Sequence, residues 1–214
     1  MRPPMRSAAH GPTLVAALLA LLVSAPSGAV YYEINTLQDD AKDNGNCTLR
    51  EALRAADANV AVDGCAAGGL DDSIVLPSGT YAFGGQEALS GAGSLSITSA
   101  TLNPFDVTVD LGGSGRFLAL TGGGIFVLGG LGIVNGVAAE GDRSGGALGA
   151  QDVTLEIFNF RFVSNAADSR GGALYYSAVA KGTEHRLTLA NGTFLGRWHH
   201  GQLQIGGGSG GGTG

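Results

Sequence analysis

The sequence predicts an all-β protein built as a parallel β-helix, a solenoid in which short strands stack coil upon coil. Short apolar segments rich in Val, Ile, Leu, Phe and Thr recur between glycines, and no stretch after residue 60 keeps the period of a helix. The motif G-G-A-L at 145–148 also returns at 171–174. A recurrence after 26 residues favours a solenoid over a β-sandwich, which is the alternative fold.

A second recurrence supports the same fold. Leu155, Asn159 and Phe162 return with the same mutual spacing as Leu187, Asn191 and Phe194. Both recurrences fit one coil, and a coil buries its inward side chains only by stacking on the next. The positions expected to repeat are therefore Gly145, Gly146, Gly171, Gly172, Asn135, Asn165 and Asn191. Asparagine tolerates left-handed backbone angles, and its amide can hydrogen-bond to the neighbouring coil.

Residues 1–29 have the pattern of a secretory signal peptide. Arg2 and Arg6 supply the positive start, 13–23 form an apolar core too short to span a bilayer, and Ser27-Gly28-Ala29 supplies small residues for cleavage. A retained membrane anchor is the alternative. The sequence thus predicts a secreted or cell-surface protein with no membrane span after signal removal.

A capping module is expected at 30–81, beginning with a strand near 30–35 and a helix at about 48–58. Thr48 and Glu51 match a capping box, in which each residue's side chain bonds the other's backbone N–H. Leu49 and Leu53 belong to one apolar stripe with Ala52 and Ala56. A helix this short must pack against something, and the open end of a β-stack is a natural surface.

The only cysteines, Cys47 and Cys65, flank this helix. Export makes a disulfide between them the expected state, because disulfides persist outside the cytoplasm. Two buried free thiols are the alternative.

The coils are expected at 82–196, although the first strands already precede them. The segments expected to form strands are 73–76, 80–83, 94–97, 107–111, 117–120, 125–134, 153–158, 160–163, 173–176, 186–189 and 193–195. Residues 197–214 are expected to be a flexible glycine-rich tail, because G-G-G-S-G-G-G-T-G at 206–214 has no side chains to bury.

N-C-T-L-R-E-A-L at 46–53, D-G-C at 63–65 and D-D-S-I-V-L-P-S-G-T-Y at 71–81 are together similar to the CSLREA domain. The pairing of G-G-A-L with F-x-x-N at 162–165 resembles the repeats of polymorphic outer-membrane proteins. These resemblances imply a bacterial exported protein with a right-handed parallel β-helix. Because such proteins usually continue for many coils, we expect this chain to be a fragment of a longer surface protein; an intentional glycine-rich tail is the alternative.

Charge and motif content narrow the function. Eighteen acidic residues outnumber twelve basic ones, two of which lie in the signal segment, and no basic stripe suits nucleic acid. No cofactor motif is present. The acidic run at 39–46 contains Lys42 where a calcium loop needs an oxygen ligand, so a solvated turn is favoured over calcium. His199 and His200 point to opposite sides of a strand and suit no joint metal site.

An enzymatic function is the less favoured interpretation of the sequence. Polysaccharide hydrolysis needs two carboxylates across a groove, and the acidic residues of the coils do not recur one coil apart. Arg143 and Arg170 lie beside the glycine pairs and could line one face. The sequence therefore predicts a non-catalytic adhesive, structural or carbohydrate-contacting protein whose partner is a polysaccharide or another cell's surface. A polysaccharide lyase or glycoside hydrolase is the alternative.

Overall fold

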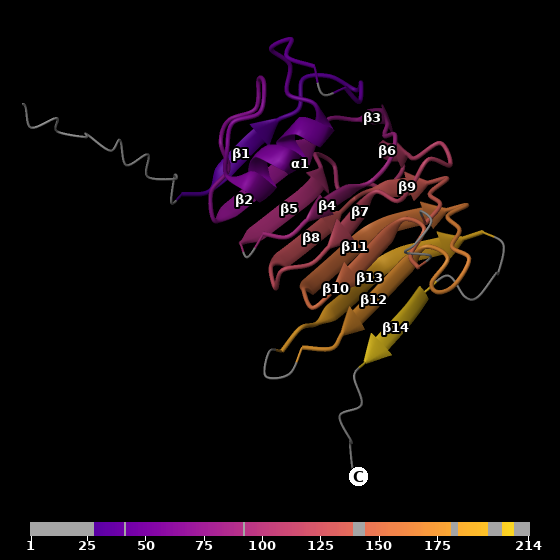
Figure 1. Cartoon of the computed structure of the whole chain (residues 1–214). Helices are drawn as coiled ribbons and strands as arrows, with labels where there is room; N and C mark the ends of the chain where they lie inside the picture. Colours follow the sequence, from indigo (N-terminus) through magenta and orange to yellow (C-terminus); the bar gives the residue numbers. More distant parts are fainter. Residues whose placement is uncertain are drawn as a thin grey trace, which may run out of the picture.

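The computed structural model describes residues 28–40, 42–91, 93–138, 144–180, 184–196 and 203–207. Within these residues the chain forms a parallel β-solenoid of about four turns with one short helix (Figure 1). The predicted fold class is confirmed, and the right-handed sense of the coil stays a prediction. The signal segment lies outside the described residues, apart from Gly28 and Ala29.

The elements follow the chain in this order: β1 (Val30–Glu33), α1 (Leu49–Ala58), β2 (Asp71–Leu76), β3 (Gly79–Ala82), β4 (Glu87–Leu89), β5 (Ser94–Ser99), β6 (Val107–Asp110), β7 (Leu118–Leu120), β8 (Ile125–Gly129), β9 (Gly132–Val134), β10 (Leu148–Gln151), β11 (Thr154–Val163), β12 (Leu174–Ala178), β13 (Leu187–Leu195) and β14 (Leu203–Gly207).

The strands form two sheets, and the larger one bends so that it makes two walls of the solenoid, which we call its two faces. β1, β2, β5, β8 and the first half of β11 stack on one face, while β3, β6, β9 and the second half of β11 stack on another. β4, β7, β10, β12 and β14 form the separate five-stranded sheet. Every pairing between these strands is parallel, so each coil lies on the previous one in register.

Side chains alternate between the interior and the surface along each strand. In β2 the inward residues Ile74 and Leu76 are fully buried, and in β5 Ile97 is 1% exposed. Aromatic rings extend this core: Phe83 and Phe117 meet edge to face with centroids 5.0 Å apart. Period-two patterning thus produced the buried column that the sequence predicted.

Residues with left-handed backbone angles form the corners. Gly130 (φ 69°), Asn159 (φ 49°) and Asn191 (φ 52°) lie where the first face of the large sheet turns into the second. Glycine and asparagine adopt this conformation with the least strain. The recurrence of Asn159 at Asn191 therefore reflects a stacked corner.

The predicted recurrences match the register of the coils. Leu148 pairs with Leu174, as the G-G-A-L repeat predicts, and Leu155 pairs with Leu187, as the second recurrence predicts. Arg170 pairs with Ser144 of the preceding coil, and Arg143 lies outside the described residues. The register of these coils therefore follows the repeated motifs.

Three strands lie outside the predicted segments. β4 begins with Glu87, and β10 continues from Leu148 of the repeat motif into Gly149-Ala150-Gln151, which weakens the apolar signal of both. β14 lies in the predicted flexible tail, yet Leu203–Gly207 pairs with Leu174–Ala178 of β12. Backbone hydrogen bonds to an existing strand hold this segment, and the tail prediction is wrong there; residues 208–214 lie outside the described part.

Candidate functional site

The predicted capping helix covers the N-terminal end of the solenoid. Thr48 Oγ1 accepts from the Glu51 N–H at 3.2 Å, and Glu51 Oε2 accepts from the Thr48 N–H at 3.0 Å. Leu49 and Leu53 are buried, and α1 ends at Asn59 with a left-handed φ of 53°. The capping box, the apolar stripe and the helix bounds are confirmed.

Cys47 and Cys65 form the predicted disulfide. Both are at most 5% exposed and lie within the core cluster. The bridge joins the chain just before α1 to the turn after it, where Val62 and Cys65 form an isolated antiparallel bridge. It therefore fixes the capping helix α1, which we call the lid helix or the lid, at both ends.

An unexpected ion-pair network lies beneath the lid. Arg50 is 8% exposed; its Nε donates to Asp39 Oδ1 at 2.6 Å and its Nη1 bonds Glu87. Its guanidinium also lies 4.0 Å from the centre of the Phe83 ring. Burial opposes the charge, but the hydrogen bonds and charges of Asp39 and Glu87 outweigh it and raise the pKa of Arg50 above its ordinary value.

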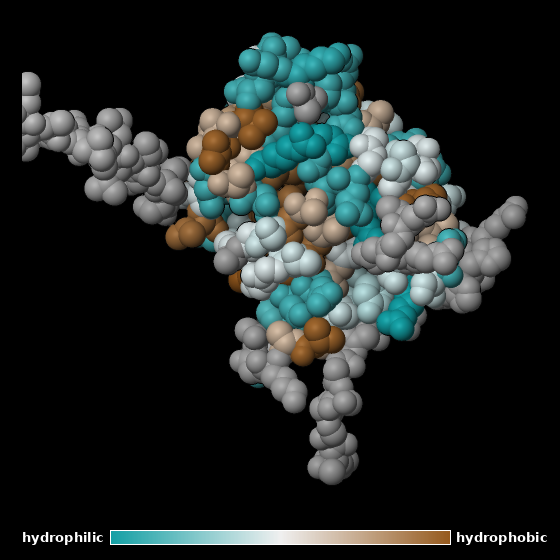
Figure 2. Space-filling view, in the orientation of Figure 1, coloured by the Kyte–Doolittle hydropathy of each residue, from teal (hydrophilic) through white to brown (hydrophobic). Residues whose placement is uncertain are grey.

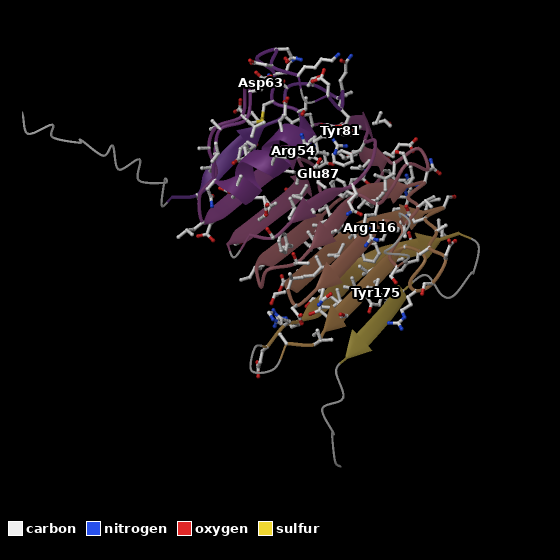
Figure 3. All side chains as sticks on the ribbon, viewed as in Figure 1. Arg54, Asp63, Tyr81, Glu87, Arg116 and Tyr175 are labelled. Atoms are coloured by element: carbon white, nitrogen blue, oxygen red, sulfur yellow. A yellow bond between two sulfur atoms is a disulfide. The ribbon has the colours of Figure 1, made fainter. Side chains whose placement is uncertain are left out.

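Glu87 joins the lid to the five-stranded sheet. It is the first residue of β4, and Arg54 Nη2 donates to its Oε1 at 2.7 Å (Figure 3). Asp39 Oδ2 also accepts from the Gly84 N–H at 2.7 Å. Because these carboxylates are saturated by partners, they position the lid and are poor candidates for chemistry.

The described residues of the acidic run, 39–40 and 42–46, are held by hydrogen bonds. Asp39 binds Arg50, while Asp63 accepts the backbone N–H groups of Asn44 and Gly45. These hydrogen bonds, that of Asn44 first, lower the pKa of Asp63. Among the described residues no group of three or more His, Cys, Asp or Glu side chains could hold a metal ion. His199 and His200 lie outside those residues.

The three predicted asparagine positions are not equivalent. Asn165 is 2% exposed, and its amide bonds the next coil through the Gly136 N–H at 2.8 Å and the Ile133 carbonyl at 2.9 Å. Asn135 has φ 58° and donates to Asp110, and Asn191 is a left-handed corner residue. Asn165 and Asn135 thus each form the expected amide contact with a neighbouring coil, Asn165 through backbone groups and Asn135 through the side chain of Asp110.

The glycine pairs stack on each other. The N–H of Gly145 donates to Gly171 O at 3.0 Å, and that of Gly146 donates to Gly172 O at 2.9 Å. Gly145 and Gly171 both have positive φ, and a Cβ on Gly146 would overlap the Gly172 carbonyl oxygen. The pairs are needed for close stacking of adjacent coils.

A candidate binding surface is the outer face of the five-stranded sheet. Residues paired across its strands form one outward row: Ala88, Ala119, Gly149 and Tyr175. Neighbouring strands are about 4.8 Å apart, so this row spans about 14 Å. Small residues therefore make the floor of this row, which the Arg116 guanidinium covers at Gly149 and which ends at the ring of Tyr175.

Polar groups surround this floor. A cavity of about 190 Å³ is lined by Arg116, Ala119, Leu120, Thr121, Gly149, Ala150, Gln151 and Tyr175. We call it the sheet groove. Arg116 is 1% exposed, and a Cβ on Gly149 would overlap its Nη1, so the absence of a side chain makes room for the guanidinium. Figure 3 shows Arg116 and Tyr175 over the same face of the solenoid.

Tyr175 and Tyr176 point in opposite directions, because neighbouring side chains of a strand alternate between its two sides. Tyr176 is 3% exposed and donates to the Val153 carbonyl at 2.9 Å, whereas Tyr175 is half-buried on the outer face. Arg170 Nη1 lies 3.4 Å from Tyr175 Oη. Of the two arginines expected on one face, Arg170 is thus beside the sheet groove, and Arg143 lies outside the described residues.

The sheet groove is suited to binding. Gln151 and Thr121 are exposed and supply amide and hydroxyl groups, and the Tyr175 ring supplies an apolar face. None of the described side chains that line the groove is a carboxylate. The pair of acids that glycoside hydrolysis requires is therefore missing from this lining.

Most of the sheet groove cannot be recognised from the sequence. Arg116, Gly149 and Gln151 belong to no motif, and they meet only through the pairing of β7, β10 and β12. The available signal was the outward position of Tyr175 in the alternating strand.

No described helix is long and apolar enough to cross a bilayer.

No family model matches the chain, and neither do any curated protein or solved structure. The likeness to the CSLREA domain therefore depends on the quoted motifs and stays a prediction.

Proposed function

We propose that this protein is a non-catalytic, exported or cell-surface solenoid that contacts carbohydrate through its sheet groove. The observation that supports this most is the groove itself: a floor of Ala119 and Gly149, an aromatic wall at Tyr175, and the polar side chains of Gln151 and Thr121. Sugars offer apolar ring faces and many hydroxyls, which match an aromatic ring flanked by amide and hydroxyl groups.

The surface around the groove supports contact with a hydrated partner. In Figure 2 the face over β7, β10 and β12 is mixed in hydropathy, without a broad strongly hydrophobic area. Protein partners in stable complexes usually cover an apolar core of interface, which this face does not present. Export is supported by the signal-like pattern of residues 1–29.

The test is binding to a panel of neutral and acidic polysaccharides. We expect saturable binding to at least one of them, and Tyr175→Ala should weaken it about 3- to 10-fold by removing the ring face. Tyr31→Ala is the matched control, because Tyr31 is a 58% exposed tyrosine of β1, outside this sheet. Loss of binding in both variants, or in neither, would contradict a site at the sheet groove.

The enzyme alternative is tested with the same panel. A lyase would release unsaturated products, and a hydrolase would create new reducing ends. We expect neither, because the described lining of the groove holds no carboxylate. Product formation that Arg170→Ala or Arg143→Ala abolishes would show an enzyme instead.

A further inference from the structure

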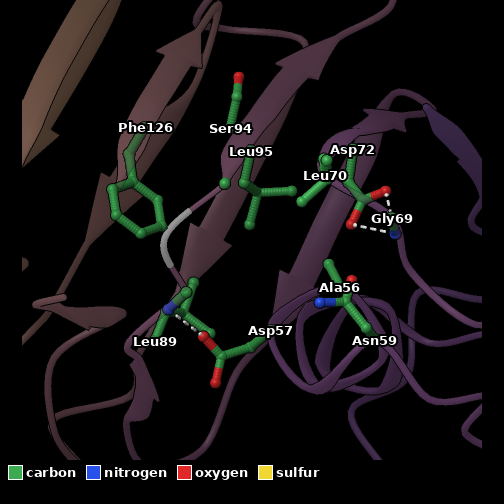
Figure 4. A pocket seen from close by; sticks show the side chains of 12 residues that line it. Ala56, Asp57, Asn59, Gly69, Leu70, Asp72, Leu89, Ser94, Leu95 and Phe126 are labelled. Atoms are coloured by element: carbon green, nitrogen blue, oxygen red, sulfur yellow. Dashed lines mark hydrogen bonds between the residues drawn. The ribbon is translucent and has the colours of Figure 1, made fainter. Parts of the chain in front are cut away.

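A second cavity enters the solenoid beside the lid helix, away from the sheet groove. It lies between the C-terminal end of α1 and the starts of β2 and β5 and has a volume of about 130 Å³ (Figure 4). One water needs roughly 15 Å³ of such space, so the cavity has room for a small organic molecule. We call it the lid cavity.

Its position follows from one column of inward side chains. Asp72 pairs with Val30 on one side and Leu95 on the other, and Leu95 pairs with Phe126, so an aspartate lies within a column that is otherwise apolar. Leu95 and Phe126 line the lid cavity together with Leu89 from β4. The cavity therefore has apolar walls and a carboxylate at one end.

Asp72 is a buried acid whose neighbours are backbone N–H groups. It is 6% exposed, and its oxygens accept from the Gly69 N–H at 2.9 and 3.2 Å. None of the described side chains that line the cavity is basic. Burial, and to a lesser extent the charge of Asp71, raises the pKa of Asp72, because these effects outweigh the hydrogen bonds from Gly69 and Val30.

We propose that the lid cavity binds a small organic cation, a primary ammonium group on an apolar body. The ammonium would lie against Asp72 and offset the unfavourable burial of its carboxylate. The apolar body would lie against Leu95, Leu89 and Phe126. Asp57, which also lines the cavity, adds a second negative charge and is held by the N–H groups of Ser90 and Gly91.

Asn59 supplies a further acceptor in this proposal. It caps α1 beside the cavity, and its Oδ1 is buried without a hydrogen-bond donor. Half a turn of the amide exchanges Oδ1 and Nδ2, which presents the oxygen to the cavity and gives an ammonium a second partner.

Phenethylammonium is a suitable probe, with 2-phenylethanol and phenylacetate as neutral and anionic analogues of the same shape. Isothermal titration calorimetry of the whole chain should show saturable binding of the ammonium, about tenfold or more weaker binding of the alcohol, and no binding of phenylacetate. Similar affinity for all three probes, or no saturable binding of the ammonium, would overturn the proposal.

Variants separate the charge from the fold. Asp72→Asn keeps an acceptor for the Gly69 N–H but removes the charge, and should weaken phenethylammonium binding about tenfold while leaving 2-phenylethanol unchanged. Asn59→Gly keeps the left-handed cap and removes the amide, and should weaken it several-fold. The matched controls are Asp110→Asn and Asn135→Gly, since Asn135 is another left-handed asparagine outside the cavity.

Circular dichroism of each variant checks that it folds. Undiminished ammonium binding by a folded Asp72→Asn protein would refute the charge pairing. If Asp72→Asn unfolds the chain, the ratio of ammonium to alcohol affinity in the unmodified protein still decides: a ratio near one contradicts the proposal.

Discussion

The two ends of the solenoid contain the same kind of coil but bury it to different depths. At the N-terminal end Ile74 and Leu76 of β2 are fully buried beneath β1 and α1. At the other end Leu187 and Leu189 of β13, which occupy inward positions, are only half-buried, and within the described residues β13 pairs with β11 alone. An inward direction is therefore insufficient; burial needs a layer on both sides of a coil.

Charge differs between the ends in the same way. The Arg50 side chain is 9% exposed and its partner Asp39 13%, whereas in the pair between Arg186 of the last coil and Glu156 the side chains are 68% and 39% exposed. Buried pairs are sensitive to loss of one partner, while exposed pairs contribute little. The lid is therefore expected to carry more of the stability than the last coil.

The largest difference in stability between the two ends is expected when one arginine from each end is replaced. Arg50→Ala should lower the free energy of unfolding by about 3–5 kcal/mol, because it leaves Asp39 and Glu87 without their buried partner. Arg186→Ala should change it by less than about 1 kcal/mol. Urea unfolding measures both, and equal effects would contradict the contrast between the ends.

The next largest difference in unfolding free energy is expected between two apolar residues, one from each end. Ile74→Ala should cost about 3–4 kcal/mol, because it leaves a cavity in a fully buried position. Leu189→Ala at the far end should cost about 1 kcal/mol, since its side chain is already partly in water. If Leu189→Ala proves as costly as Ile74→Ala in thermal and urea unfolding, a further layer covers β13 in solution.

The disulfide is expected to contribute slightly less. Replacing Cys47 and Cys65 by serine should lower stability by about 3 kcal/mol, because the bridge closes a loop between them and restricts the unfolded chain. Denatured, unreduced protein should show no labelled thiol. Labelling of two thiols would mean that the bridge is absent from the protein in solution.

The smallest effect concerns the helix cap. Thr48→Ala removes the hydroxyl that accepts the Glu51 N–H and should cost about 1 kcal/mol. Thr193→Ala, at an exposed position of β13, is the control and should have little effect. A loss with Thr193→Ala as large as with Thr48→Ala would show that the cap adds nothing specific.

Local patterns predicted much of the fold but little of the groove. Thr48 and Glu51 lie within one helical turn, so their contact depends only on helix geometry, and the alternation at Ser94–Ser99 defined a strand in the same way. The row from Ala88 to Tyr175 depends on the pairing of four strands that are far apart in the sequence. Single residues such as Gly149 contain no signal of that pairing.

One column of the large sheet shows why the pairing is hard to read from the sequence. Its members occupy the same position on successive strands, yet they are unevenly spaced along the chain. They are Asp72, Leu95, Phe126, Leu155 and Leu187. The coils therefore differ in length, and a search for one fixed period finds only some of the stacked positions.

By itself the sequence determined the capped helix, the cysteine pair, most strands and the stacked repeats, because each depends on neighbours in the chain or on a repeated motif. Only the tertiary structure decided that Arg50 is buried between Asp39 and Glu87, that Asp72 lies within an apolar column, and that Leu203–Gly207 forms a strand. The physical reason is that loops of different length between strands shift which residues meet. Stacking therefore follows backbone pairing in three dimensions.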